Sequence, residues 1–164
     1  MSRERSGGHK VLCGCLTAIA VVLFLILVVA AYAVLYVPKA DNLTSKLDGK
    51  DQLTAMQYKS ESEVSLSAAA MLLVLQKVTD MEFHGVEIVE FIDNSDSSED
   101  AAYGIVVYTD SIKTASTAMV NYVKFIMDKE SDEVSDLNYH VSARGKAIYF
   151  GNKNGEVEFR KVIF

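Results

Sequence analysis

The longest apolar stretch of the chain covers residues 11–37 and contains no charged residue. An α-helix of this length reaches roughly 40 Å, which exceeds the roughly 30 Å hydrocarbon core of a bilayer. Tyr32 and Tyr36 stand near its end, where amphipathic rings suit a membrane interface, and Pro38 follows where the helix must stop. The pattern predicts a transmembrane helix at residues 11–37, in contact with the lipid bilayer, after a tail of residues 1–10.

Basic residues on the two sides of this segment set the predicted orientation. Three precede it closely and three are spread through the stretch after it. They are Arg3, Arg5 and Lys10 before the segment, and Lys39, Lys46 and Lys50 after it. The tail is therefore expected in the cytosol and the C-terminal domain outside the plasma membrane, with a single-pass signal-anchor. The alternative is a cleaved secretory signal, because residues 31–33 read Ala-Tyr-Ala, a form that signal peptidases accept.

Residues 38–59 are polar with scattered apolar positions, and we interpret them as a linker. The domain, residues 60–164, opens with Ser60 and Glu63 at the spacing of a capping box, so we expect a helix over about residues 61–80. Its apolar positions cover most of the helix circumference. They are Val64, Leu66, Ala68, Ala70, Met71, Leu72, Leu73, Val74, Leu75 and Val78. Such a helix is buried on several sides or shared with a partner.

Two runs rich in β-branched residues, 86–92 and 103–108, are predicted strands, and the Asp- and Ser-rich residues 93–100 form the loop between them. Because the second run is apolar at both alternating sets of positions, we expect it at the centre of the sheet. A second helix is predicted over residues 110–129, led by Asp110. Its apolar stripe consists of Ile112, Ala115, Met119, Tyr122 and Ile126.

The remaining residues are strand-like. Strands are predicted at 139–144 and 147–150, joined by a tight turn, and at 157–163 after a hairpin turn at 152–155, which reads Asn-Lys-Asn-Gly. The domain order is therefore α-β-β-α-β-β-β. We predict an α+β fold with the helices packed on one face of a mainly antiparallel sheet.

Charge and cysteine content narrow the class of partner. The tail has three basic residues against Glu4, a net charge of +2, and the remainder has 13 basic and 21 acidic residues, a net charge of −8, which together give −6. An acidic domain argues against nucleic-acid binding. Cys13 and Cys15 both lie in the apolar stretch, so the domain holds no disulfide. The pair is either a site of reversible acylation or two small residues at a helix end.

The most conspicuous polar cluster is the acidic loop, which contains Asp93, Asp96, Glu99 and Asp100. A calcium-binding loop that starts at Asp93 needs glycine at its sixth position and glutamate at its twelfth. These positions hold Ser98 and Gly104 instead. The pattern therefore favours a solvated loop over a metal site.

His84 and His140 are candidate general bases, but no nucleophile motif and no phosphate-binding glycine loop accompanies them. We assign no catalytic, cofactor-binding or metal-ligating residue. Four basic residues near the C-terminus either dock an acidic partner or simply solubilise the surface. They are Arg144, Lys146, Arg160 and Lys161.

These observations favour a non-catalytic interaction or accessory subunit of the cell envelope, with a protein partner or a homo-oligomeric state and no cofactor. An apolar N-terminal helix joined to an α+β domain also suits a pilin-like assembly subunit, although no glycine-led processing site precedes the apolar run. A small-ligand-binding or hydrolytic envelope protein is the third alternative, since it would require a cleft with a perturbed acid or histidine.

Overall fold

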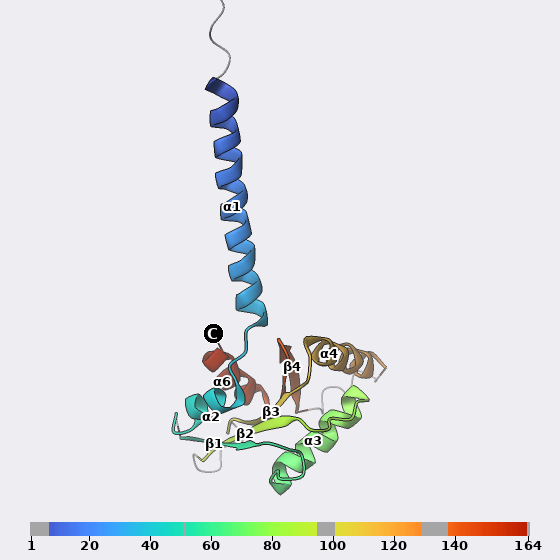
Figure 1. Cartoon of the computed structure of the whole chain (residues 1–164). Helices are drawn as coiled ribbons and strands as arrows, with labels where there is room; N and C mark the ends of the chain where they lie inside the picture. Colours follow the sequence, from blue (N-terminus) through green and yellow to red (C-terminus); the bar gives the residue numbers. More distant parts are fainter. Residues whose placement is uncertain (1–6, 51, 95–100, 129–137, 164) are drawn as a thin grey trace, which may run out of the picture. The chain divides into compact units, whose positions relative to one another are not determined.

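The computed structural model describes residues 7–50, 52–94, 101–128 and 138–163, with the side chains of α1 described at residues 19–32 and 35. The chain divides into two compact units, Met1–Leu35 and Tyr36–Phe164. The first unit holds α1, Gly7–Leu35, and the second holds all the strands and the other helices that the structure describes (Figure 1).

The described side chains of α1 are apolar and exposed on all sides of the helix. However, no helix among the described residues is long and apolar enough to cross a membrane. The predicted transmembrane helix at residues 11–37 is therefore wrong for the described chain. The bilayer contact, the signal-anchor and the plasma-membrane location with a cytosolic tail were derived from that helix, and they are corrected with it.

The second unit is built on a five-stranded sheet in the order β1-β2-β3-β5-β4, in which every neighbouring pair is antiparallel. The strands are β1 Leu53–Tyr58, β2 Glu87–Asp93, β3 Tyr103–Tyr108, β4 His140–Arg144 and β5 Ala147–Gly151. The helices are α2 Ala40–Leu47, α3 Leu66–Thr79, α4 Ile112–Met127 and α6 Lys153–Ile163. The α+β class and the antiparallel sheet agree with the prediction, and β3 lies at the centre of the sheet.

Helices cover both faces of this sheet, so the predicted packing on one face is wrong. The register aligns Val89, Val106 and Tyr149 across three strands, and this row packs against α2 and α6. The adjacent row, Ile88–Val107–Ile148, packs against α3 and α4 on the other face. Figure 1 shows the two helix pairs on opposite sides of the strands.

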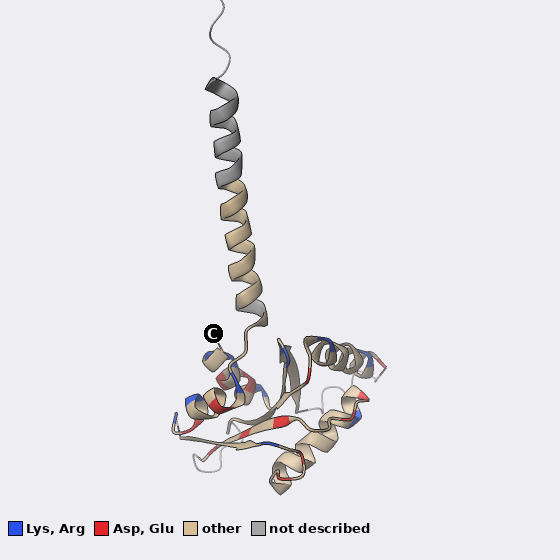
Figure 2. Cartoon of the chain, in the orientation of Figure 1, with Lys and Arg blue, Asp and Glu red and all other residues tan. Residues whose placement is uncertain are grey.

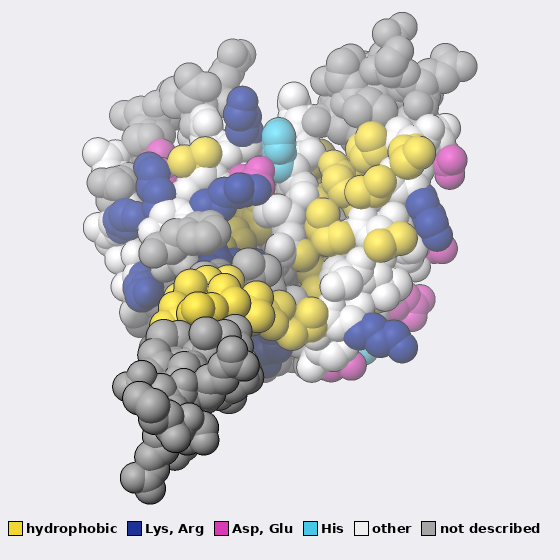
Figure 3. Space-filling view, turned by 90° about the horizontal axis from the view of Figure 1, so that it is seen from above, with side chains coloured by type: hydrophobic (Ala, Val, Ile, Leu, Met, Phe, Trp, Pro, Cys, Tyr) yellow, Lys and Arg dark blue, Asp and Glu magenta, His cyan; other side chains and the backbone are white. Residues whose placement is uncertain are grey.

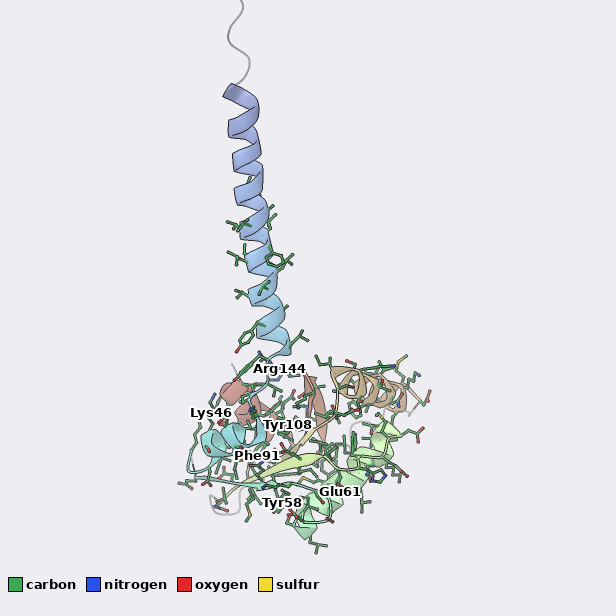
Figure 4. All side chains as sticks on the ribbon, viewed as in Figure 1. Lys46, Tyr58, Glu61, Phe91, Tyr108 and Arg144 are labelled. Atoms are coloured by element: carbon green, nitrogen blue, oxygen red, sulfur yellow. The ribbon has the colours of Figure 1, made fainter. Side chains whose placement is uncertain are left out.

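The predicted element order is also wrong, because the segment interpreted as a linker, residues 38–59, contains α2 and β1. Leu43 and Leu47 of α2 are fully buried against the sheet. The Tyr108 hydroxyl donates a hydrogen bond of 2.9 Å to the carbonyl of Pro38 just before α2, and Figure 4 labels Tyr108 and Phe91 on this side of the sheet. Because α2 has only eight residues, its apolar positions are too short a pattern for the sequence to reveal a helix.

At the C-terminus a helix replaces the predicted hairpin and final strand. The side chain of Asn152 accepts hydrogen bonds from the Gly155 N–H at 2.8 Å and from the Tyr103 N–H at 3.1 Å. Asn152 is therefore an N-cap, with Gly155 in the first turn of α6. The adjacent Asn154-Gly155 pair suited a hairpin turn. The buried apolar residues that favour a helix, Phe159, Val162 and Ile163, lie beyond it.

The two predicted long helices exist but begin later than expected. Ser65 caps α3 by accepting from the Ala68 N–H at 3.0 Å, and Ser111 caps α4 by accepting from the Thr114 N–H at 3.1 Å. The expected capping residue of α3, Ser60, instead lies outside the helix.

Candidate functional site

The acidic loop and the cysteines contribute no described site. Residues 95–100 of the loop lie outside the described residues, and Asp93 ends β2. The side chains of Cys13 and Cys15 also lie outside the described part. Among the described residues, no group of three or more His, Cys, Asp or Glu side chains could hold a metal ion.

His84 lies between two carboxylates in the loop before β2. Its Nε2 is 3.0 Å from Glu82 Oε2, and its Nδ1 is 3.6 Å from Glu61 Oε1. The hydrogen bond with Glu82 raises the pKa of His84, and the charges of Glu82 and Glu61 add to this effect. The Glu61 carboxylate accepts a hydrogen bond from the Gly85 N–H at 2.9 Å. The pKa of Glu61 is lowered, mainly because its carboxylate also accepts a hydrogen bond from its own backbone N–H. The imidazole is mostly exposed, so the geometry ties two loops together and provides no enclosed site for catalysis.

His140 and two of the basic candidates are held by α6. Glu156 is 3.4 Å from His140 Nδ1 and accepts from Arg160 Nη2 at 2.7 Å. Lys161 pairs with Glu158 at 2.5 Å on the same helix. Arg144 is half-buried on β4, where Figure 4 labels it, and Lys146 is exposed in the turn that follows. Two of the four basic candidates, Arg160 and Lys161, are therefore each paired with an acidic side chain of α6.

Sequence reasoning missed a polar cluster around Glu90 of β2. Its carboxylate accepts hydrogen bonds from Tyr58 at 2.9 Å, from Ser65 at 2.7 Å, and from Ser67. Burial and the bond to Glu90 raise the pKa of Tyr58, which Figure 4 labels near the start of α3. Since Ser65 also caps α3, Glu90 fixes the N-terminus of this helix to the sheet. The role of the cluster is structural, and no spacing in the sequence reveals it, because its members come from three different elements.

The outer face of α4 is an apolar surface that none of the other described elements covers. α4 contacts the core through small side chains, Ala115 and Ala118, both of which are buried. Tyr122 and Phe125 pack against the same core and are partly buried. One side of α4 therefore packs on the core through Ala115, Ala118, Tyr122 and Phe125, and its other side faces away from the sheet.

Large apolar side chains are exposed along the outer face of α4, and we call this surface the α4 outer face. The exposed fractions are 45% for Ile112, 54% for Val120, 50% for Val123 and 77% for Met127. Met119 and Ile126, which are half-exposed, lie beside them. The spacing of three, four and seven residues places these side chains on one side of the helix. Figure 3 shows hydrophobic side chains gathered over this helix.

Charge is confined to the two ends of this surface. Lys113 and Lys124 are the only charged residues within α4, and Asp128 is its C-cap (Figure 2). The ten positions 114–123 carry no charge. An exposed apolar surface without charge across its middle is typical of a protein contact surface, because charged residues are depleted at the centre of interfaces.

Sequence reasoning found only part of this surface. The stripe predicted for this helix combined Ala115, which is buried, with Ile112, which is exposed. Val120, Val123 and Met127 form a second apolar stripe, and their presence signalled that the helix has more than one apolar side. The sequence pattern predicted contact with a partner for the helix at residues 61–80, which corresponds to α3. This helix also exposes Leu73, at 66%.

Comparison with known proteins gives no match: no protein-family model, no curated protein and no solved structure is significantly similar to this chain. An account of its function therefore depends on the geometry of the described surfaces.

Proposed function

We propose that the second unit of the chain is a non-catalytic protein-interaction domain whose contact surface is the α4 outer face. The observation that carries this proposal is the exposure of four large apolar side chains along one uncharged side of one helix. Complete burial of a side chain of this kind stabilises a protein by about 1.5–3 kcal/mol. Four side chains that are about half exposed therefore leave several kcal/mol of association free energy available to a partner.

The polar groups support a binding role over an enzymatic one. His84, His140 and Glu90 are each engaged by neighbouring side chains that tie elements of the fold together. Each of these interactions connects two parts of the domain: His84 joins two loops, His140 contacts α6 from β4, and Glu90 fixes the N-terminus of α3 to the sheet. The α4 outer face has no such role within the domain.

Site-specific cross-linking tests the proposal. A photoreactive benzophenone amino acid is placed at Val120 in the full chain, and a matched variant carries it at Lys153, which is exposed on α6 across the sheet. Irradiation in the cells that make the protein is expected to give a discrete adduct from position 120 and none from position 153. The adduct should disappear when Val123→Glu is added and persist when Thr117→Glu is added, because Thr117 is exposed but polar.

An absence of adducts from position 120 overturns the proposal. Adducts of equal yield from both positions also overturn it, because they indicate random collision with neighbours. The control with Thr117→Glu excludes a general effect of an added negative charge on α4.

A further inference from the structure

We propose that the partner of the α4 outer face is a second copy of this chain, packed with the two α4 helices antiparallel about a two-fold axis near Met119 and Val120. This inference rests on the proposed interaction function and names its partner. A symmetric pair needs a surface that is complementary to itself after a half-turn. The residues of α4 satisfy this requirement in both their apolar and their charged positions.

The apolar positions match when the helix is placed against a reversed copy of itself. With the axis between Met119 and Val120, these two residues face each other across the interface. Moving outward, Ser116 faces Val123 of the second copy, and Ile112 faces Met127. Each facing pair thus contains at least one large apolar side chain, and no pair contains a charge. The intervals of four and three residues in this series also match the seam of two packed helices.

The charges at the ends of α4 favour the antiparallel orientation. Lys113, near the N-terminus, comes beside Asp128 of the second copy, and beside the negative end of that helix. The two-fold axis makes this contact twice. Lys124 comes opposite the uncharged positions 114–117. In a parallel arrangement Lys113 would instead lie beside Lys113 of the second copy and Asp128 beside Asp128, so that like charges would repel.

The free edge of β1 is a weaker candidate for self-association. The loop before β1 covers part of this edge, because the Leu53 N–H donates to the Lys50 carbonyl at 2.8 Å and the Leu53 carbonyl accepts from the Gly49 N–H at 2.9 Å. The Asp48 carboxylate accepts from the Ala55 N–H at 3.2 Å. Backbone groups that are already paired do not recruit a strand from another chain.

Charge exchange between two variants tests the second copy directly. Lys113→Asp and Asp128→Lys are made separately in the full chain, and mass is measured by sedimentation equilibrium. Each variant alone places like charges at both ends of the interface, so its dimer dissociation constant is expected to rise about tenfold. An equimolar mixture of the two variants should restore association, because each heterodimer carries two opposite-charge contacts. The double variant, K113D with D128K, should associate like the original chain.

Self-association through α1 is distinguished by the same variants, since it would be insensitive to both charges. A second measurement uses Val120→Cys in a chain with Cys13→Ser and Cys15→Ser. Mild oxidation should link two copies through position 120, whereas the matched Thr117→Cys variant should stay unlinked. Thermal unfolding of each variant verifies that it is folded.

The outcomes separate this inference from the proposed function. A cross-link from position 120 to a protein other than this chain would show that the partner is not a second copy, and so would a dimer that neither charge change affects. Either result is compatible with the proposed interaction function. A chain that is monomeric and forms no adduct at position 120 overturns both. Restored dimer formation in the mixture of Lys113→Asp and Asp128→Lys supports both the interaction function and the second copy as partner.

Discussion

At the scale of single residues, His84 in the loop before β2 contacts Glu61 in the loop before α3 and Glu82 in its own loop. Because the bond to Glu82 raises the pKa of His84, the folded protein binds this proton more tightly than the unfolded chain does. The stabilising effect is complete below the ordinary histidine pKa of about 6.5 and is lost as the pH rises through the raised value.

We expect an NMR titration of the imidazole in the full chain to give a pKa for His84 above its ordinary value. Glu82→Gln should lower that pKa by a larger amount than Glu61→Gln, because the hydrogen bond to Glu82 is the main cause of the shift. Titration of His84 at or below about 6.5 would contradict the structure.

Glycine is required where β3 and β5 approach each other around the ring of Tyr149. The Tyr149 hydroxyl donates to the carbonyl of Asn152 at 2.6 Å, and a Cβ atom added at Gly104 would lie 2.5 Å from the same ring. At Gly151 the added atom would meet the backbone carbonyl of Tyr103, which cannot move aside as a side chain can. The close approach therefore leaves no room for a methyl group.

Gly151→Ala should lower the free energy of unfolding by about 3 kcal/mol, since overpacking typically costs about 1–3 kcal/mol and here involves backbone. Gly85→Ala is the control. It has open space around it but a φ of +62°, so it should cost about 1–2 kcal/mol. Urea unfolding monitored by circular dichroism measures both changes. A loss in Gly151→Ala no larger than that in Gly85→Ala would show that the atoms around Gly151 move aside to admit a methyl group.

At the scale of an element, the position of the cap determines where α3 begins. Ser65→Ala should lower the free energy of unfolding by about 1–2 kcal/mol, because it removes the N-cap bond and a donor to Glu90. Ser60→Ala removes only a local bond to Ser62 and should change stability by less than about 0.5 kcal/mol. Chemical denaturation of the two variants compares the cap that the structure shows with the cap that the spacing of Ser60 and Glu63 predicts. The reverse order of effects would favour a helix that begins near residue 61.

The elements with long, regular patterns are the ones that the sequence predicts well. β3 has the predicted bounds, and α3 and α4 lie inside the predicted ranges. The ends of the domain are different, because α2 and α6 are short helices whose apolar faces become evident only against the sheet. Residues 152–155 illustrate the ambiguity, since Asn154-Gly155 suits a hairpin turn and Asn152 suits an N-cap. Contacts with Tyr103, which is distant in the sequence, decide between the two.

At the scale of the whole domain, one signal in the sequence pointed to the layered arrangement but was not carried through. β3 is apolar on both faces, which implies that both faces of the sheet are covered. The two predicted helices were placed on one face of the sheet, so the other face needed further helices. These are α2, in the segment interpreted as a linker, and α6, in the segment interpreted as a strand. The polar cluster at Glu90 was beyond prediction because its members come from three elements, and the α4 outer face was predictable only in part because it depends on which side of the helix the fold buries.

If two copies associate through α4, the stability of the folded chain must depend on its concentration. Ligand-like binding of one folded copy to another stabilises the native state in proportion to the logarithm of concentration relative to the dissociation constant. The unfolding temperature of the full chain should therefore rise with each tenfold increase in protein concentration. Differential scanning calorimetry across a hundredfold range measures this dependence.

Val120→Glu should abolish the concentration dependence while leaving the unfolding temperature at the lowest concentration nearly unchanged, because Val120 is 54% exposed in the single chain. Thr117→Glu should preserve the dependence. If Val120→Glu instead lowers the unfolding temperature equally at every concentration, then this side chain stabilises the single chain itself. The α4 outer face would in that case belong to the interior of the protein's own fold and not to an interface.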